Sequence, residues 1–194
     1  MTTLATAPEV ARSIADVLEA SGLSSAIGGA IALGFYAVPR ATVDVDVNVF
    51  VAPQEAELGR ALAALASAGF EPDDDARRVL AQAMQEGQFR GRIAGMRVDV
   101  FVPAIPYYGE LSERRRAATL LGREVWILGP EDLVVLKMMF YRRKDLADVE
   151  ALLRDQGRDF DFDFARRKLA ELAGEDDERL QALDQILRDA QASD

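Results

Sequence analysis

The sequence predicts an α+β protein: a small mixed β-sheet flanked by helices, followed by a C-terminal helical part. Two Val-rich segments, at residues 43–51 and 96–102, alternate apolar and polar residues, as strands with one buried face do. Apolar residues at helical spacing surround these segments, and no strand pattern follows residue 129. We therefore expect an α/β core over residues 1–128 and a helical region over residues 129–194, packed on that core.

Helix and strand signals alternate through the first third of the chain. Val10, Ile14 and Leu18 recur at helical spacing before a Ser-Gly pair that is typical of a helix C-cap. Pro39 restricts the backbone of the residue before it, so a short helix should end ahead of it. Pro53 suits the first turn of a further helix. We expect helices over residues 7–20, 30–37 and 53–68, and strands over residues 23–27 and 43–51.

The middle of the chain is expected to complete the sheet. An acidic stretch with a proline indicates a loop, and an Ala94-Gly95 pair is typical of a tight turn between two strands. Pro103 and Pro106 break the pattern after the second of these strands. The expected elements are a loop over residues 71–75, helices over 76–87 and 107–119, and strands over 89–93, 96–102 and 124–128.

The C-terminal part is expected to consist of four helices. Pro130 and two acids open the first, where proline fits and the helix dipole favours negative charge. Gly174 separates the last two, which should form a closing hairpin. Asp159, Asp161 and Asp163 are spaced like metal ligands, but N-capping of the third helix by Asp161 or Asp163 explains them better. The expected spans are residues 130–141, 145–153, 162–173 and 177–190.

Composition excludes several kinds of catalytic site. The 194 residues include no cysteine and no histidine. Their absence removes disulfides, zinc–thiolate sites, cysteine nucleophiles, Ser-His-Asp triads and histidine general bases. A metal ion would therefore need oxygen ligands, a set that suits Mg²⁺, Mn²⁺ or Ca²⁺.

Charge and hydropathy limit which cellular locations and partners the sequence predicts. The net charge of -10 argues against broad, non-specific nucleic-acid binding, although it leaves room for a local basic patch. Arg114, Arg115 and Arg116, with Arg123, could hold the phosphates of an RNA acceptor or form an ordinary solvated face. The sequence has no apolar run long enough to span a membrane and no signal-peptide pattern, so we expect a cytoplasmic protein.

Two aspartates occupy the polar face of the strand expected over residues 43–51. Valines at every second position form one face, and Asp44, Asp46 and Asn48 lie on the other. Aspartate is a poor strand former. Two carboxylates roughly 7 Å or less apart on one face also repel each other unless a cation lies between them. Asp99 has the equivalent position on the second Val-rich strand, so we expect a third carboxylate beside the first two.

A Gly28-Gly29 turn precedes the acidic strand and completes the candidate site. Glycines let the backbone approach a phosphate closely, and the N-terminus of the following helix attracts anions. In nucleotidyl transfer, a divalent ion bridges triphosphate oxygens and neutralises charge on the leaving pyrophosphate. Asp99 could in addition accept the proton of an attacking hydroxyl, since histidine is absent. The alternative is a half-exposed sheet with solvated acids and an ordinary glycine turn.

This combination of motifs resembles the polymerase β-type nucleotidyltransferase superfamily. The similarity consists of the Gly-Gly turn, a short helix, Arg-x-Thr-x-Asp-x-Asp at residues 40–46, and the lone Asp99 on a second strand. It extends to Pro-Glu-Asp-Leu at residues 130–133, to Lys137, and to Arg-Lys-Asp-Leu-Ala-Asp at residues 143–148. Within the superfamily, the chain is similar to the AbiEii-like branch, which includes toxins of toxin–antitoxin and phage-defence systems.

The resemblance implies a nucleotidyltransferase fold and an enzyme that moves a nucleoside monophosphate from an NTP to a hydroxyl of an RNA end or a protein. Mg²⁺ (or Mn²⁺) would be the cofactor, and an antitoxin-like protein could be a partner. A catalytically inactive nucleotide-binding or protein-interaction module is the alternative. Lys137 would reach a phosphate, or would be an ordinary surface lysine. The implied metal ligands are Asp44, Asp46 and Asp99, the last also as base, and the implied nucleotide-binding residues are Gly28, Gly29, Arg40, Thr42, Lys137 and Asp145.

Overall fold

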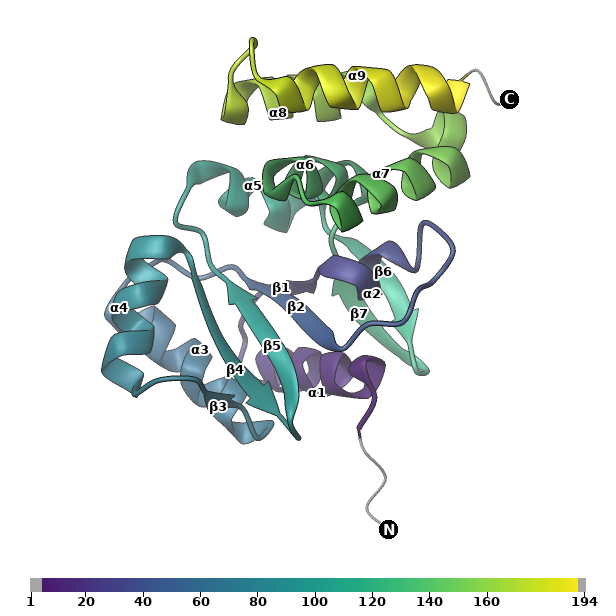
Figure 1. Ribbon diagram of the computed structural model, residues 1–194. Coiled ribbons are helices and arrows are strands. Elements are labelled where there is room, and N and C mark those ends of the chain that lie inside the picture. The colour runs from purple at the N-terminus through teal and green to yellow at the C-terminus, as the bar shows by residue number, and fades with distance from the viewer. Residues whose placement is uncertain (1–4, 192–194) are drawn as a thin grey trace. The chain divides into compact units, whose positions relative to one another are not determined.

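The computed structural model describes residues 5–191, which divide into two compact units (Figure 1). The first unit takes in residues 5–32 and 40–128, and the second takes in residues 33–39 and 129–191. The chain therefore leaves the first unit after residue 32, returns at residue 40, and leaves it again after residue 128. Within the described range, no helix combines the length and the apolar character needed to cross a membrane.

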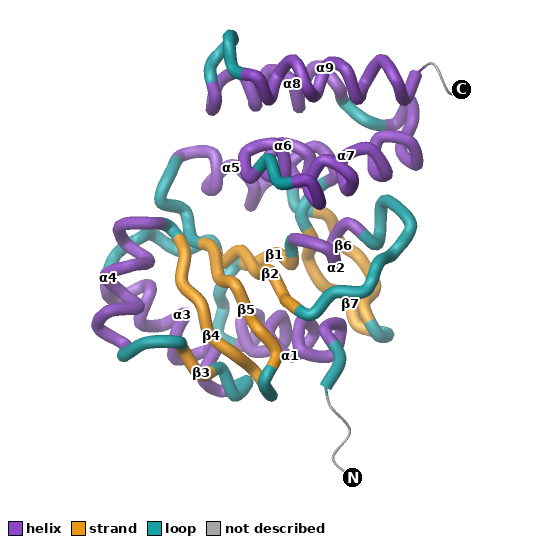
Figure 2. Tube along the Cα trace, viewed as in Figure 1, coloured by secondary structure: helices purple, strands orange, loops and turns teal. Residues whose placement is uncertain are grey.

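A seven-stranded mixed sheet forms the centre of the first unit, in the order β3-β4-β5-β2-β1-β7-β6 (Figure 2). Parallel pairing joins β2 to β5 and β1 to β7, and the other neighbours are antiparallel. The strands are β1 (Ser25–Ile27), β2 (Asp44–Val49), β3 (Glu71–Pro72), β4 (Gln88–Ile93), β5 (Met96–Phe101), β6 (Arg116–Leu120) and β7 (Arg123–Ile127). The mixed sheet with flanking helices is the architecture that the sequence predicts.

One face of this sheet is apolar and belongs to the core of the first unit. The helices of the unit are α1 (Ala7–Ala20), α2 (Gly29–Leu33), α3 (Glu55–Ser67), α4 (Ala76–Glu86) and α5 (Pro106–Arg114). Val45, Val47 and Val49 of β2 are fully buried, since side chains two apart share a face of a strand. Helix α1 packs against β1, β2 and β7 and buries Ile14 and Leu18. The polar side chains of β2 therefore point to the opposite face.

The second unit is helical. Its elements are α6 (Pro130–Phe140), α7 (Arg143–Gln156), a 3-10 turn (Gly157–Asp159), α8 (Phe162–Ala173) and α9 (Glu178–Gln191). Helix α6 packs against α7 and α8, and α8 packs against α9. Buried leucines, among them Leu133, Leu152 and Leu169, form the core between these helices.

The segment at residues 33–39 belongs to the helical unit although it lies between two elements of the sheet unit. The backbone amide of Val38 donates a 3.0 Å hydrogen bond to Asp155. The side-chain amide of Gln156 donates a 2.9 Å bond to the carbonyl oxygen of Tyr36. The connection between the Gly-Gly turn and the acidic strand is therefore anchored to the end of α7.

The prediction of a helix over residues 107–119 is wrong in its second half. Helix α5 ends at Arg114, Arg115 is extended (φ -59°, ψ 150°), and Arg116–Leu120 forms β6, antiparallel to β7. The run Arg-Ala-Ala-Thr-Leu favours a helix more than a strand by local propensity. The tight Leu121-Gly122 turn, where both residues have positive φ, instead folds this run onto β7 as a hairpin.

Two shorter elements also differ from prediction. The expected loop over residues 71–75 contains β3, a two-residue strand at the sheet edge that pairs with β4. Proline is tolerated at such an edge, where its missing N–H breaks no ladder. The helix expected over residues 30–37 is shorter, since α2 ends at Leu33.

The N-capping expected for the third C-terminal helix is confirmed. The Asp161 carboxylate accepts a 2.9 Å hydrogen bond from the backbone amide of Phe164 at the start of α8. Asp163, in the first turn of the helix, interacts favourably with the helix dipole instead of capping a specific amide.

We expect Asp161→Ala to destabilise the protein by about 1 kcal/mol, because the capped amide loses its acceptor. The measurement is urea denaturation followed by circular dichroism. Asp163→Ala is the matched control: it removes the same charge from an exposed position in the first turn without removing a capping bond, and should cost only about 0.3–0.5 kcal/mol. Equal losses in the two variants would show that Asp161 acts through its charge alone.

Candidate active site

A charged face of the sheet is built by the register of three neighbouring strands. The parallel pairing of β2 with β5 places Asp46 opposite Asp99, and the antiparallel pairing of β4 with β5 places Arg90 opposite Asp99. Side chains of residues paired in register lie on the same face, close enough to interact. The expectation that Asp99 lies beside the acidic pair is confirmed.

A second row of charges lies two residues along the same face. Asp44 of β2 is in register with Arg97 of β5, and Arg97 is in register with Arg92 of β4. The two rows therefore contain three aspartates and three arginines across three strands. The charges of the carboxylates are balanced locally, which allows acids to occupy adjacent positions in a sheet.

The Asp99 carboxylate is held by two guanidinium groups. Arg90 Nε lies 2.5 Å from Oδ1, and Arg97 Nη2 lies 3.0 Å from Oδ1 and 2.9 Å from Oδ2. The hydrogen bond to Asp99 raises the pKa of Arg97 against the effect of burial, and the charges of Asp99, Asp44 and Asp46 raise it further. The Arg97 guanidinium thus lies in the electric field of all three aspartates.

The Gly-Gly turn fits tightly against β2. Gly29 has φ +55°, and a Cβ at this position would lie 1.7 Å from Oδ2 of Asp46, far inside van der Waals contact. Glycine is therefore required at position 29 both by the backbone conformation and by the neighbouring carboxylate. The backbone amide of Gly28 donates a 2.9 Å bond to the Asp46 carbonyl oxygen, so it fixes the turn to the acidic strand.

We expect Gly29→Ala to destabilise the protein by at least about 1–3 kcal/mol and to displace the Asp46 side chain, because of the positive φ and the steric overlap. Urea denaturation measures the loss. Gly59→Ala is the control: Gly59 lies within α3, nothing lies within 4 Å of its added Cβ, and alanine there should stabilise by up to about 1 kcal/mol. A Gly29→Ala variant as stable as the wild type would contradict the requirement for glycine.

Thr42 and Arg40 lie on the segment that leads into β2. The Thr42 hydroxyl donates a hydrogen bond to the Asp44 carboxylate, and it lies 3.2 Å from the Asp44 carbonyl oxygen. Thr42 therefore orients Asp44, a contact that fits the Thr-x-Asp part of the motif. Arg40 is exposed on this segment.

Tyr108 of α5 is a site residue that the sequence did not reveal. Its ring stacks on Phe101 of β5, with ring centroids 6.3 Å apart and an interplanar angle of 21°. Burial, and secondarily the charge of Asp46, raises the pKa of Tyr108 to about 12. The available signal was the Tyr-Tyr pair that follows Pro106 shortly after the second Val-rich strand.

We expect Tyr108 to ionise at higher pH than an ordinary tyrosine. At pH 11 its phenol should stay mostly protonated, whereas a tyrosine with a pKa near the reference value of about 10 is mostly ionised. A folded-state pKa above the unfolded value gives stabilisation that is complete below about pH 10 and is lost as the pH rises toward 12. Ultraviolet titration of tyrosinate measures this. Tyr108→Phe should remove the late phase, and Asp46→Asn should move it to lower pH.

Lys137 and Asp145 belong to a buried ionic cluster in the helical unit. Lys137 of α6 donates a 2.6 Å hydrogen bond to Asp148 of α7 and lies 3.8 Å from Asp145. Asp145 in turn accepts bonds from the backbone amide and Nε of Arg142. Lys137, Asp145 and Asp148 are all buried. Lys137 is therefore not an ordinary surface lysine, and its role at a phosphate stays a prediction.

The arginines at residues 114–116 do not lie on one helix. Arg114 ends α5 and Arg116 begins β6. Arg114 of α5 lies over the Tyr107 ring at 5.7 Å, and Arg115 lies over the Trp126 ring at 4.5 Å. Arg123 pairs with Asp16 at 3.0 Å. These contacts are cation–π and ion-pair interactions within the fold.

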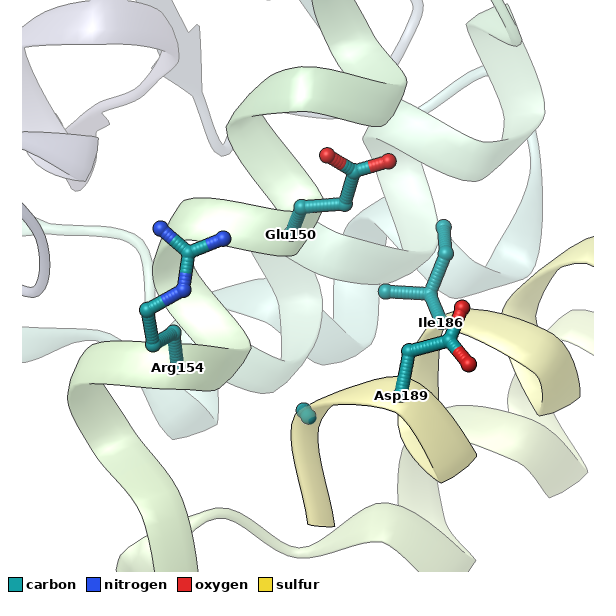
Figure 3. A pocket seen from close by; sticks show the side chains of 5 residues that line it. Glu150, Arg154, Ile186 and Asp189 are labelled. Carbon is teal, nitrogen blue, oxygen red and sulfur yellow. The ribbon is translucent and has the colours of Figure 1, made fainter. Parts of the chain in front are cut away.

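Two pockets flank different parts of the chain. One, of about 260 Å³, opens beside Arg90 and Asp99 and is also lined by Asp73, Asp74, Gln82, Gln88 and Phe89. The other, of about 240 Å³, is lined by Glu150 and Arg154 of α7 and by Ile186 and Asp189 of α9 (Figure 3). The first adjoins the charged face of the sheet, and the second contains none of the site residues predicted from the sequence.

The charged face offers oxygen donors that suit a divalent cation. Carboxylate oxygens are the ligands that Mg²⁺ and Mn²⁺ prefer, and Asp44 and Asp46 offer them from one strand. Among residues 5–191, however, no three acidic side chains converge in the arrangement of a metal site. Both Asp99 oxygens are bonded to arginine. The donor chemistry fits a metal held by Asp44 and Asp46, with Asp99 engaged elsewhere.

The fold is similar to solved nucleotidyltransferase structures. The solution structure of the antibiotic-resistance factor ANT(2'')-Ia matches with a TM-score of 0.61 at 14% identity, over 92% of this chain and 95% of that chain. The crystal structure of ANT(2")-Ia in complex with adenylyl-2"-tobramycin also gives 0.61 at 14% identity, over 84% and 96% of the two chains.

A third solved structure, an antigenic nucleotidyltransferase-like protein from Paracoccidioides brasiliensis, matches with a TM-score of 0.51 at 19% identity, over 91% of each chain. No protein-family model and no curated protein sequence gives a significant match. The likeness to these structures establishes a nucleotidyltransferase fold, which is the fold that the sequence motifs predict.

Proposed function

We propose that this protein is a metal-dependent nucleotidyltransferase that moves a nucleoside monophosphate from an NTP to a hydroxyl group of an acceptor. The observation that carries the proposal is the register of β2 and β5, which pairs Asp46 with Asp99. Asp44 lies two residues away on the same face, and Gly29 packs against the Asp46 carboxylate. The nucleotidyltransferase fold supports the same reaction class.

In the proposed reaction, the acceptor oxygen bonds to the α-phosphorus of the NTP. The bond from that phosphorus to the oxygen bridging to the β-phosphate breaks, and pyrophosphate leaves. Asp99 accepts the proton of the acceptor hydroxyl at a carboxylate oxygen, since the chain has no histidine to do so. Thr42 keeps the Asp44 carboxylate in position through its hydroxyl.

Asp44 and Asp46 would hold the metal ion, Mg²⁺ or Mn²⁺, through carboxylate oxygens. Such an ion, when bound, neutralises charge that builds on the phosphate oxygens during transfer. The nucleotide side of the site would include Arg40. The motif resemblance also implies a phosphate-binding role for Lys137. The Asp148 carboxylate that bonds to Lys137 would then orient its ammonium group.

The acceptor is proposed from charge. A chain with a net charge of -10 repels polyanions and attracts cations, which disfavours an RNA end and favours a cationic compound that carries hydroxyl groups. ANT(2")-Ia was solved in complex with adenylyl-2"-tobramycin, so tobramycin is a suitable first acceptor to assay. RNA 3′ ends and protein hydroxyls, which the sequence resemblance suggested, are the other two acceptor classes.

A non-catalytic nucleotide-binding module is the second candidate function. One observation favours it: both oxygens of Asp99, the proposed base, are bonded to arginine side chains. Placement in the AbiEii-like branch, with a toxin role and an antitoxin-like partner, remains a prediction from the motif resemblance.

We expect Mg²⁺ with the correct NTP to raise the melting temperature, because a ligand held at about 100 times its dissociation constant stabilises the folded state by about 2.7 kcal/mol. Asp46→Asn should abolish the rise. Asp16→Asn is the matched control: it removes the same charge from α1, where Asp16 pairs with Arg123, and should keep the rise.

Transfer is measured directly with each α-labelled NTP, Mg²⁺ and one acceptor class at a time. Label on an acceptor that depends on Asp46 supports the enzyme. A melting-temperature rise without transfer to any acceptor supports the non-catalytic module. Absence of any rise with all four NTPs would rule out both nucleotide-dependent functions.

A further inference from the structure

Asp99 lies beneath two arginine side chains that are far more exposed than it is. The Asp99 side chain is 11% exposed, whereas those of Arg90 and Arg97 are 48% and 43% exposed. The Arg90–Asp99 pair also borders the pocket of about 260 Å³ on the sheet unit. A ligand that approaches from solvent would therefore meet the guanidinium groups before it meets the carboxylate.

The hydrogen bonds leave neither carboxylate oxygen of Asp99 without an arginine donor. Oδ1 accepts from Arg90 Nε and Arg97 Nη2, and Oδ2 lies 2.9 Å from Arg97 Nη2. Charge-assisted bonds of this kind are stronger than neutral ones and compete with a metal ion or a proton for the same lone pairs. Asp99 is thus available as ligand or base only after these bonds are weakened.

We propose that Arg90 and Arg97 are positioning residues that withhold Asp99 in the free protein and release it when a triphosphate draws their guanidinium groups away. This inference rests on the proposed nucleotidyl-transfer function. A triphosphate carries several negative charges and bonds to guanidinium in the same planar geometry as a carboxylate. Both guanidinium groups are half-exposed, so a triphosphate that arrives from solvent can replace Asp99 as their partner.

Arg92 provides a neighbouring comparison. It lies two residues from Arg90 on β4 and is in register with Arg97. Its guanidinium bonds to the backbone carbonyl of Gly95 at 3.1 Å, whereas those of Arg90 and Arg97 bond to Asp99. Arg92→Gln therefore removes one positive charge from the same face and leaves the bonds on Asp99 intact.

The test measures two ligands separately on the full chain, without nucleotide. Mn²⁺ binding is followed by electron paramagnetic resonance, and binding of inorganic triphosphate by calorimetry in the absence of metal, both near 0.15 M salt. We expect Arg97→Gln and Arg90→Gln each to strengthen Mn²⁺ binding about fivefold and to weaken triphosphate binding by a similar factor. Arg92→Gln should change Mn²⁺ binding less than about twofold, because its charge is screened.

A double-mutant cycle links the effect to Asp99. In an Asp99→Asn background, the gain in Mn²⁺ affinity from Arg97→Gln should fall below about twofold, since the carboxylate charge that the substitution releases is gone. Circular dichroism and melting temperature establish that each variant folds. If Arg97→Gln does not fold, Arg90→Gln, which removes a single bond to Oδ1, carries the test.

Any of four outcomes would overturn the inference: unchanged Mn²⁺ affinity in Arg90→Gln and Arg97→Gln, equal gains in Mn²⁺ affinity for Arg92→Gln and Arg97→Gln, no Mn²⁺ binding in any arginine variant, or stronger triphosphate binding in those variants. Failure of the proposed function has a different signature. Opposite shifts for Mn²⁺ and triphosphate, with no label transfer to any acceptor, would keep the role of the arginines and reject the enzyme. Label transfer to an acceptor, with unchanged Mn²⁺ affinity in the arginine variants, would keep the enzyme and reject the role of the arginines.

Discussion

The parallel pairing of β2 with β5 is the constraint on which the site depends. A strand exposes alternate residues on each face, so the buried valines of β2 and β5 dictate which residues face the other way. A slip of one residue would bury Asp46 and Asp99 in the apolar core, at a cost of several kcal/mol per charge. The hydrophobic core on one face of the sheet thus fixes the positions of the acids on the other.

The acidic pair is tolerated because positive charge is supplied from neighbouring strands. Arg90, Arg92 and Arg97 occupy positions in register with Asp99 or with each other, so they offset the repulsion between the acids. A cation or a phosphate that binds to this face therefore competes with the ion pairs that Asp99 already makes with Arg90 and Arg97. The balance among these charges, more than the presence of the acids, decides how readily the site accepts ligands.

The sequence allowed prediction of the acidic strand, the third carboxylate and the Gly-Gly turn, because each depends on local periodicity or on a short motif. The arginine partners of Asp99 were not predicted, since they follow from the pairing of β4 with β5 and not from spacing within one strand. Tyr108 was missed for a similar reason: its contact with Phe101 arises when α5 folds back on β5. The sequence predicts helix where β6 lies, and this is wrong because the hairpin turn at Leu121 overrides the helical propensity of Arg116–Leu120.

The close approach of Gly29 to Asp46 has a consequence for how this protein can vary among its relatives. A side chain at position 29 meets the Asp46 carboxylate, so it fits only if the backbone at 29 changes or the carboxylate turns away, and the two positions are coupled. A relative that keeps the acid at 46 with a side chain at 29 must therefore hold that acid in a different orientation. A relative that lost the acid would be relieved of the steric clash, though not of the positive φ. The residue at position 29 thus sets the directions in which a carboxylate at position 46 can point.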